Sequence, residues 1–213
     1  MSLLVTFEGI EGSGKSTHLR FLAAHLRASG RAVVETREPG GTPAGAQLRR
    51  LLLGTDRVPL EPVVELLLYC ADRAQHVAEV IRPALAAGRI VLCDRFSDST
   101  IAYQGYGRGL DLDTVRAIDG RARDDLLPAL TFLLDCPVHD GLARARGRTG
   151  AGDRFEDAPG DFHERIRAGF CTLASSEPER FCVLDSTQPT EEVRARVVAE
   201  TERRLGGSRR TFS

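Results

Sequence analysis

Residues 9–16 combine residue types and a spacing that suit the binding of phosphate groups. They read Gly-Ile-Glu-Gly-Ser-Gly-Lys-Ser and match the pattern G-x-x-x-x-G-K-[ST]. In such a loop, backbone N–H groups surround a phosphate, the lysine reaches the outer phosphates and the last hydroxyl faces Mg²⁺. The nucleotide-binding residues predicted here are Gly9, Ile10, Glu11, Gly12, Ser13, Gly14, Lys15, Ser16 and Thr17.

The lysine of this motif is the only one in the sequence, because the 29 basic residues comprise 28 Arg and Lys15. Such a skew indicates a general compositional preference for Arg. Lysine carries a compact ammonium that fits inside a phosphate-sized loop, whereas the planar guanidinium of Arg is larger. Lysine therefore occurs only at the position where the motif requires it. This favours a phosphate-binding loop over a glycine-rich turn without a ligand.

A second predicted site for a metal or its water shell is Asp94, which ends the apolar run of residues 90–93. Together with the Ser16 hydroxyl it offers the hard oxygen ligands that Mg²⁺ prefers. The alternative is that Asp94 caps a turn or a helix. Arg95 follows Asp94, where motor ATPases carry a catalytic Glu, so a motor ATPase is disfavoured. A GTPase is also disfavoured, because the guanine-reading motif Asn-Lys-x-Asp is absent from a sequence that has no Asn.

Several arginines indicate a second anion site next to the loop. Arg37 and Arg95 directly follow predicted strands, and Arg49 and Arg73 lie on the neighbouring predicted helices. In open α/β folds ligands bind at the carboxyl ends of the strands, where these side chains gather. Transfer between two phosphorylated substrates needs positive charge at both ends, because donor and acceptor repel each other. For each arginine taken alone, a solvated surface role is the alternative.

A polar segment at about residues 144–160 has the composition of a mobile lid. It is rich in Gly, Arg and Asp, and a helix end followed by such a loop suits closure over a nucleotide. A disordered charged loop is the alternative. Its arginines are Arg144, Arg146, Arg148 and Arg154.

The elements that must position these residues alternate between short apolar runs and longer helical patterns, which is typical of βαβ units and a parallel sheet. Strands are predicted at residues 3–7, 32–35, 90–93, 130–134 and 181–184. Helices are predicted between them, with a break within 62–87, and residues 105–109 are predicted to be flexible. We expect one α/β domain over 1–213: a P-loop NTPase-type three-layer sandwich with about five parallel strands, helices on both faces and a lid.

Composition narrows the class of protein further. A hydrophobic content of 42% supports a full core, and 29 basic against 30 acidic residues give a net charge of −1. This balance disfavours broad binding to nucleic acids or membrane surfaces. The five cysteines show no CxxC spacing, and no uncharged apolar run approaches ~18 residues. We therefore expect a soluble cytoplasmic protein with no nucleic-acid or membrane partner.

Beyond the glycine-rich loop, the sequence resembles the bacterial thymidylate kinase family over nearly its whole length. The similarity runs from Phe7-Glu8-Gly9 to Thr187-Gln188-Pro189. It includes Arg37-Glu38-Pro39-Gly40-Gly41-Thr42, Asp94-Arg95-Phe96 and the run from Asp98 to Gly105. The resemblance implies a kinase that makes dTDP from dTMP with Mg·ATP, and a homodimer.

The resemblance also implies roles for individual residues of the acceptor site. Glu11 would lie near the 3′-hydroxyl and the metal, and Tyr69 would stack on thymine. Tyr103 would crowd a ribose 2′-hydroxyl, although a core aromatic is the alternative for both tyrosines. The dTMP-binding residues would be Glu11, Arg37, Arg49, Tyr69, Arg73, Arg95, Ser99, Thr100, Tyr103 and Gln104.

For catalysis, the family pattern implies Lys15, Glu11 and Arg95 together with a lid arginine, because Gly12 stands where eukaryotic relatives place Arg. The lid arginine would be Arg148 or Arg154. Gln188 and Pro189 would pack against adenine. Two other functions stay open from the residues: a kinase for another nucleoside or nucleoside monophosphate, and a P-loop nucleotide switch without a small-molecule acceptor.

Overall fold

The core of the protein is a five-stranded, all-parallel sheet with the strand order β2-β3-β1-β4-β5. The computed structural model describes residues 2–54, 58–149 and 160–207. All six residues of β1 are buried, as expected for a central strand with helices on both faces. The strands are β1 (Leu3–Glu8), β2 (Val33–Arg37), β3 (Ile90–Asp94), β4 (Leu130–Asp135) and β5 (Phe181–Asp185).

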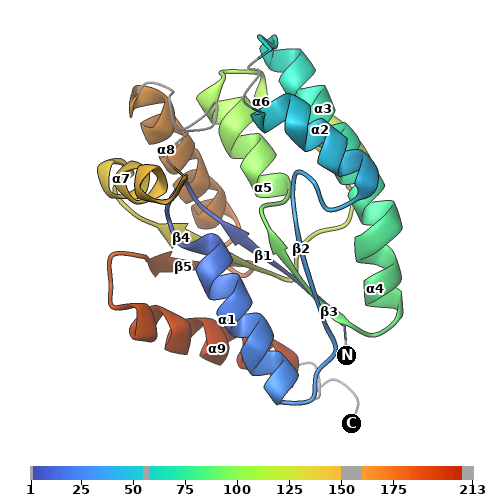
Figure 1. Ribbon diagram of the computed structural model, residues 1–213, viewed down its shortest axis with the longest axis vertical. Coiled ribbons are helices and arrows are strands. Elements are labelled where there is room, and N and C mark those ends of the chain that lie inside the picture. The colour runs from blue at the N-terminus through green and yellow to red at the C-terminus, as the bar shows by residue number, and fades with distance from the viewer. Residues whose placement is uncertain (1, 55–57, 150–159, 208–213) are drawn as a thin grey trace.

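Helices cover both faces of this sheet and complete a three-layer sandwich (Figure 1). The first helix and the last pack against one face, and their leucines and valines meet Val5, Phe7 and Phe132 there. Most of the remaining helices lie on the opposite face, together with two π-helical segments, η1 and η2. The elements are α1 (Lys15–Ala28), α2 (Pro43–Leu53), α3 (Pro62–His76), η1 (Val77–Ile81), α4 (Arg82–Ala86), α5 (Ser97–Thr100), η2 (Ile101–Gly107), α6 (Leu112–Ala122), α7 (Val138–Thr149), α8 (Gly160–Ser176) and α9 (Thr190–Gly207).

The strand order places the glycine-rich loop at the switch point of the sheet. Strand β1 lies between β3 and β4, and the chain leaves it to form β2 on the far side of β3. The neighbouring connections therefore diverge at the carboxyl end of β1, which opens a crevice above that strand. The loop after β1 and the residues that follow β3 both face this crevice.

The predicted fold class and all five strands are confirmed, with strand ends shifted by one or two residues. The predicted break within residues 62–87 is the π-helical segment η1, just before Pro83, whose ring nitrogen has no proton to donate. Among the described residues, no helix is long and apolar enough to cross a membrane.

One local prediction is wrong, because most of residues 105–109 are helical rather than flexible. Gly105 and Gly107 are buried within η2. A Cβ on Gly105 would lie 2.5 Å from Leu112, and one on Gly107 would lie 2.9 Å from Phe162. These glycines therefore permit close packing of η2 on α6 and α8, and the sequence alone does not separate that role from flexibility.

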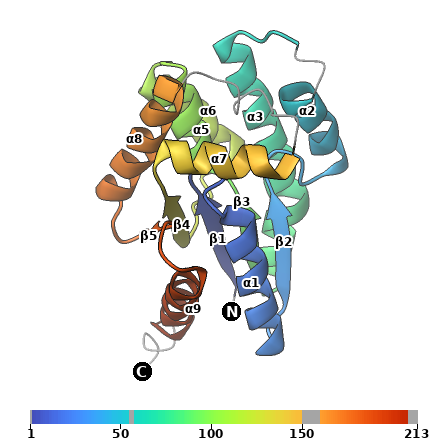
Figure 2. The same ribbon diagram turned by 60° about the vertical axis from the view of Figure 1, so that its left-hand side comes forward.

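The predicted lid region is helical over its first part. The helix α7 extends to Thr149, into the segment at about residues 144–160 that is predicted to be the lid. Figure 2 shows α7 above the carboxyl ends of the strands. Residues 150–159, with Arg154, lie outside the described residues, and so does the side chain of Arg148.

Candidate active site

The phosphate-binding loop forms at the end of β1 because glycines permit its tight turns. Gly9, Gly12 and Gly14 have φ values of 134°, 70° and 96°, a region that disfavours other residues. Gly14 ends the loop and caps α1, so the first N–H groups of that helix face the crevice. This geometry matches the anion site predicted from the motif.

Lys15 extends from the start of α1 back into the loop. Its Nζ donates to the carbonyl oxygens of Gly9 at 3.0 Å and Ile10 at 2.7 Å, and to Ser13 Oγ at 3.3 Å. Burial and the nearby Arg95 lower the pKa of Lys15 to about 8, against the opposing effect of the neighbouring carboxylates. The loop therefore holds its ammonium by backbone oxygens, at the place where a phosphate would bind.

Gly12 brings the loop into direct backbone contact with α7. A Cβ on Gly12 would lie 1.9 Å from the carbonyl oxygen of Gly141, and one on Gly141 would lie 2.6 Å from that of Glu11. Only two glycines allow this approach. The base of the helix that leads into the predicted lid therefore packs on the phosphate-binding loop.

The two predicted metal ligands lie together. The Ser16 hydroxyl donates a hydrogen bond to Asp94 Oδ2. Asp94 ends β3, which pairs with β1, so the strand register brings both oxygens to one edge of the sheet. Among the described residues there is no group of three or more His, Cys, Asp or Glu side chains that could hold a metal. These oxygens fit a Mg²⁺ that takes most of its ligands from water and phosphate.

Arg95 turns sharply into the crevice after β3. Its φ is 68°, a strained value for a residue with a side chain. Its guanidinium donates to Gly9 O at 2.9 Å, Ser99 Oγ at 3.1 Å and Glu11 Oε1 at 3.0 Å. The side chain therefore lies across the mouth of the phosphate-binding loop.

Glu11 accepts hydrogen bonds that hold it ionised. Its Oε1 accepts from Arg95 and from the Tyr103 hydroxyl, and its Oε2 lies 3.5 Å from His163 Nδ1. Burial acts to raise the pKa of Glu11, but Arg95, His163 and Lys15 outweigh it and lower the pKa to about 2. The carboxylate is therefore negative at all working pH values.

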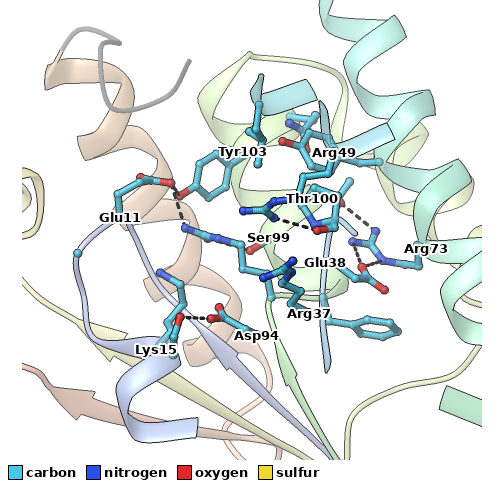
Figure 3. Close-up of a pocket in the computed structure, with 18 of the residues that line it drawn as sticks. Glu11, Lys15, Arg37, Glu38, Arg49, Arg73, Asp94, Ser99, Thr100 and Tyr103 are labelled. Atoms are coloured by element: carbon cyan, nitrogen blue, oxygen red, sulfur yellow. Dashed lines mark hydrogen bonds and ion pairs between the residues drawn. The ribbon is translucent and has the colours of Figure 1, made fainter. Parts of the chain in front are cut away.

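One cavity of about 310 Å³ joins this loop to the opposite wall of the crevice. Figure 3 shows Lys15 and Asp94 at one end of it, and Arg49 and Arg73 toward the other. All ten predicted dTMP-binding residues line it, with Gly12, Gly14, Lys15, Ser16 and Asp94 of the loop region. Four further lining residues were not predicted, namely Glu38, Pro39, Leu53 and Phe96.

Arg73 forms a rigid part of the cavity wall. Its side chain is almost fully buried, with 1% of the residue exposed. It donates to Glu38 at 2.9 Å and Thr100 Oγ1 at 2.9 Å, and it also bonds Asp119. Burial acts to lower the pKa of Arg73, but the carboxylates of Glu38 and Asp119 raise it. Both carboxylates share its charge, so the guanidinium has a fixed orientation.

Several buried polar residues around the site are not predicted by the sequence, among them Glu8, Glu65 and His163. Glu8 accepts from Phe96 N at 2.7 Å and Ser99 Oγ at 2.6 Å, beneath Arg95. Glu65 and His163 lie on buried faces of α3 and α8. Glu65 interrupts the apolar run Val-Val-Glu-Leu-Leu-Leu, which is a usable signal for a buried charge. A lone buried histidine gives no such signal.

Six of the predicted nucleotide-binding residues do not line the cavity, namely Gly9, Ile10, Ser13 and Thr17 of the loop, and Gln188 and Pro189. Gln188 and Pro189 follow β5 and are exposed, and Gln188 Nε2 donates to Asp185 at 2.9 Å. Their loop is tied to α7, because Arg144 Nη1 donates to Ser186 O at 3.1 Å. Arg37 and Arg49 do line the cavity, and Arg49 also donates to Pro39 O at 2.8 Å.

A glycine-rich loop at the switch point of a parallel sheet, with a buried Lys and a Ser–Asp pair, defines a P-loop nucleotide-binding protein. A model of the thymidylate kinase family matches residues 7–197. The chain belongs to the thymidylate kinase family.

Named relatives show the same similarity. A thymidylate kinase of Geotalea uraniireducens is 50% identical over 210 residues, covering 96% of this chain and 99% of the relative. One of Desulfovibrio desulfuricans is 54% identical over 197 residues, covering 90% and 91%. The crystal structure of thymidylate kinase from Ehrlichia chaffeensis superposes with a TM-score of 0.73 at 34% identity, covering 96% of this chain and 98% of that one.

Proposed function

We propose that this protein transfers the γ-phosphoryl group of Mg·ATP to dTMP and forms dTDP and ADP, a step toward dTTP. The observation that carries this proposal is the single cavity in which the phosphate-binding loop meets an aromatic and arginine-rich wall. Such a cavity brings two phosphorylated ligands together. The names of the relatives, all thymidylate kinases, supply the identity of the acceptor.

The phosphate-binding loop is the donor half of the site. Its N–H groups and Lys15 would hold the β- and γ-phosphates of ATP. Ser16 and Asp94 would hold Mg²⁺, directly and through water, and Mg²⁺ supplies charge neutralisation between the phosphates. Gln188 and Pro189 would pack against adenine, since their loop is tied to α7 beside the phosphate-binding loop.

The opposite wall is the acceptor half. Arg37, Arg49 and Arg95 would clamp the phosphate of dTMP, because all three line the same cavity as Lys15. The Tyr69 ring would stack on the base, and Arg73 would bond the base through the guanidinium edge that faces the cavity.

The sugar would lie between these walls. The Tyr103 ring would leave no room for a 2′-hydroxyl, and the Glu11 carboxylate would accept from the 3′-hydroxyl. Ser99 would act through Arg95, to which it is bonded. Gln104 and Thr100 would meet the polar edge of the base.

Phosphoryl transfer in this site needs aligned substrates and positive charge rather than a general base. A phosphate oxygen of dTMP attacks the γ-phosphorus, and the bond to the β,γ-bridging oxygen breaks so that ADP leaves. The attacking oxygen is already an anion, so no proton has to be removed. Lys15, Arg95 and a lid arginine, Arg148 or Arg154, would neutralise the transferring group.

The direct test is ADP formation from ATP with and without dTMP in a coupled assay. We expect ADP only with dTMP, and kcat/KM for dTMP well above that for dCMP or dGMP. Equal rates on all nucleotides would exclude thymidylate selectivity. Nucleotide binding without turnover would instead indicate a switch.

We also propose that the protein is a homodimer. An exposed apolar surface on α2 and α3, formed by Leu51, Val63, Val64 and Leu67, supports it. Light scattering should give twice the mass of one chain, and Leu67→Glu should give a monomer. An unchanged dimer in that variant would place the interface elsewhere.

Two broader expectations belong with this proposal. Residues 1–213 should unfold as one domain in one cooperative transition, which calorimetry tests. A cytoplasmic location suits an ATP-dependent enzyme, and all five cysteines are free thiols, as in a reducing compartment. Cell fractionation tests it.

A further inference from the structure

The side-chain amide of Gln104 is held by a buried carboxylate outside the cavity. Gln104 lines the cavity and is 1% exposed. Its Nε2 donates to Glu65 Oε1 at 3.0 Å. Glu65 lies on α3 and does not line the cavity, so it contacts Gln104 from behind.

The orientation of this amide follows from what Glu65 can accept. Arg108 donates to both oxygens of Glu65, from Nε at 3.1 Å and from Nη2 at 3.0 Å. With both of its oxygens accepting from the guanidinium of Arg108, the Glu65 carboxylate acts as an acceptor of hydrogen bonds. The NH₂ group of Gln104 must therefore face Glu65, and the carbonyl Oε1 is the part of the amide left to accept from a ligand.

A second chain of hydrogen bonds gives the opposite polarity at Thr100, four residues earlier. Arg73 Nη1 donates to Thr100 Oγ1 at 2.9 Å, and Arg73 is itself fixed by Glu38 and Asp119. Since the guanidinium can only donate, the hydroxyl accepts from it and its own proton is left to donate. The cavity wall therefore offers an acceptor at Gln104 and a donor at Thr100.

We propose that Glu65 is a specificity-determining residue that acts by positioning: it fixes the Gln104 amide so that the site accepts a base edge with an N–H beside a carbonyl. This inference deepens the proposed function and rests on it. The imide edge of thymine or uracil has that pattern. Cytosine presents an acceptor at ring nitrogen 3 and an amino donor beside it, so both of its groups meet a group of the same polarity.

The matching experiment compares Glu65→Gln with Glu61→Gln. Glu61 lies one turn earlier, just before α3, and is exposed, so its variant loses the same charge without touching Gln104. In Glu65→Gln, the new amide can donate or accept, and both orientations of Gln104 become available. We expect the ratio of kcat/KM for dCMP to that for dTMP to rise about tenfold or more. The ratio for dUMP to dTMP should change less than about twofold, because both bases share the imide edge.

A merely structural role would give a different result. Equal losses for dTMP, dUMP and dCMP in Glu65→Gln, or the same changes in Glu61→Gln, would overturn the proposal. Wild-type activity with dTMP is measured in the same series. Absence of that activity would refute the proposed function, whereas the variant ratios test the role of Glu65.

A measurement on the unmodified protein covers the case in which Glu65→Gln does not fold. Calorimetric titration with dTMP, dUMP, dCMP and 3-methyl-dTMP should give similar Kd values for the first two. The Kd should be about tenfold or more higher for dCMP and for 3-methyl-dTMP, which lacks the N–H. Equal affinity for dTMP and 3-methyl-dTMP would show that Gln104 Oε1 does not accept from the base, and would overturn the proposal.

Discussion

Tyr103 donates a hydrogen bond from its hydroxyl to Glu11 Oε1, which ties the π-helical segment after β3 to the phosphate-binding loop. The same ring lies under Arg95, whose guanidinium carbon is 4.9 Å from the ring centre. Burial and the Glu11 carboxylate raise the pKa of Tyr103, against the effect of Arg95, so the hydroxyl keeps its proton. The Tyr103 side chain thus contacts both charged groups, Glu11 and Arg95, and fixes their positions.

This relationship separates two roles of Tyr103. Tyr103→Phe keeps the ring but leaves Glu11 with one donor fewer, so we expect kcat to fall about tenfold while the preference for deoxyribonucleotides stays. Tyr103→Leu removes the flat ring and should also raise activity on the ribonucleotide relative to dTMP. Kinetics with both sugars measure this. Loss of the preference in Tyr103→Phe would contradict a steric role for the ring.

Lys15→Arg should keep the fold and lose activity. The larger guanidinium does not fit the three loop oxygens that hold Nζ, and it cannot bind the γ-phosphate in the same place. We expect a similar melting temperature and a kcat lower by about a thousandfold or more. Arg89→Lys, the reverse exchange at an exposed site, is the control and should behave as wild type. A kcat near that of wild type in Lys15→Arg would refute the phosphate-binding role.

Glu11→Gln should flatten the dependence of stability on pH in the acid range. The folded-state pKa of Glu11 is lowered from 4.5 to about 2, so its stabilisation is complete above pH 4.5 and is lost as pH falls through that interval. The difference corresponds to about 3 kcal/mol in the free energy of unfolding. Urea titrations between pH 2 and 7 measure it. Parallel curves for variant and wild type would exclude this contribution.

Glu8→Gln should change the pH dependence of the free energy of unfolding in the opposite direction from Glu11→Gln. Burial and the nearby Asp98 raise the pKa of Glu8 to about 8, although hydrogen bonds from Ser99 and Phe96 and the charge of Arg95 oppose the shift. Wild type therefore loses stability as pH rises from 4.5 toward 8, because the Glu8 carboxyl ionises in the unfolded state while the buried carboxyl of the folded state stays protonated. The stability of Glu8→Gln relative to wild type should increase over that range. A constant difference between the two proteins would show that Glu8 is ionised throughout.

Gly12→Ala should disrupt the site through contact rather than through backbone conformation. A Cβ on Gly12 would lie 1.9 Å from the Gly141 carbonyl oxygen, whereas one on Gly30 would meet nothing within 4 Å. The two glycines have similar φ values of 70° and 76°, so both alanines carry the same backbone cost of ~1 kcal/mol. We expect Gly12→Ala to melt at a lower temperature than Gly30→Ala and to be inactive. Equal effects would mean that α7 yields to the added methyl group.

Most of the sheet and the phosphate-binding loop could be predicted from the sequence, because local patterns encode them. The loop needs glycines at fixed spacing, and buried parallel strands need continuous apolar runs such as residues 130–134. The arginines at strand ends were predicted for the same reason, since the carboxyl edge of the sheet brings Arg37 and Arg95 together wherever the strands pair.

The carboxylates behind the site could not be predicted, because their partners are distant in the sequence. Asp119 lies 46 residues from Arg73, and in the sequence it is one polar residue in an ordinary amphipathic helix. Glu38 was visible in a motif, but only the fold shows that it pairs with Arg73 and His76. The glycines of η2 were misread because close packing and flexibility call for the same residue.

The single lysine has a practical consequence for chemical biology. Lys15 Nζ is the only side-chain primary amine in the sequence, and it lies inside the phosphate-binding loop. An acylating reagent that modifies side-chain amines therefore labels this position and none of the 28 arginines. If Lys15 holds the phosphates as proposed, bound nucleotide blocks this acylation. The mass added to the peptide that contains Lys15 then reports the unoccupied fraction of the site, without a mutation, a fluorophore or a coupled enzyme.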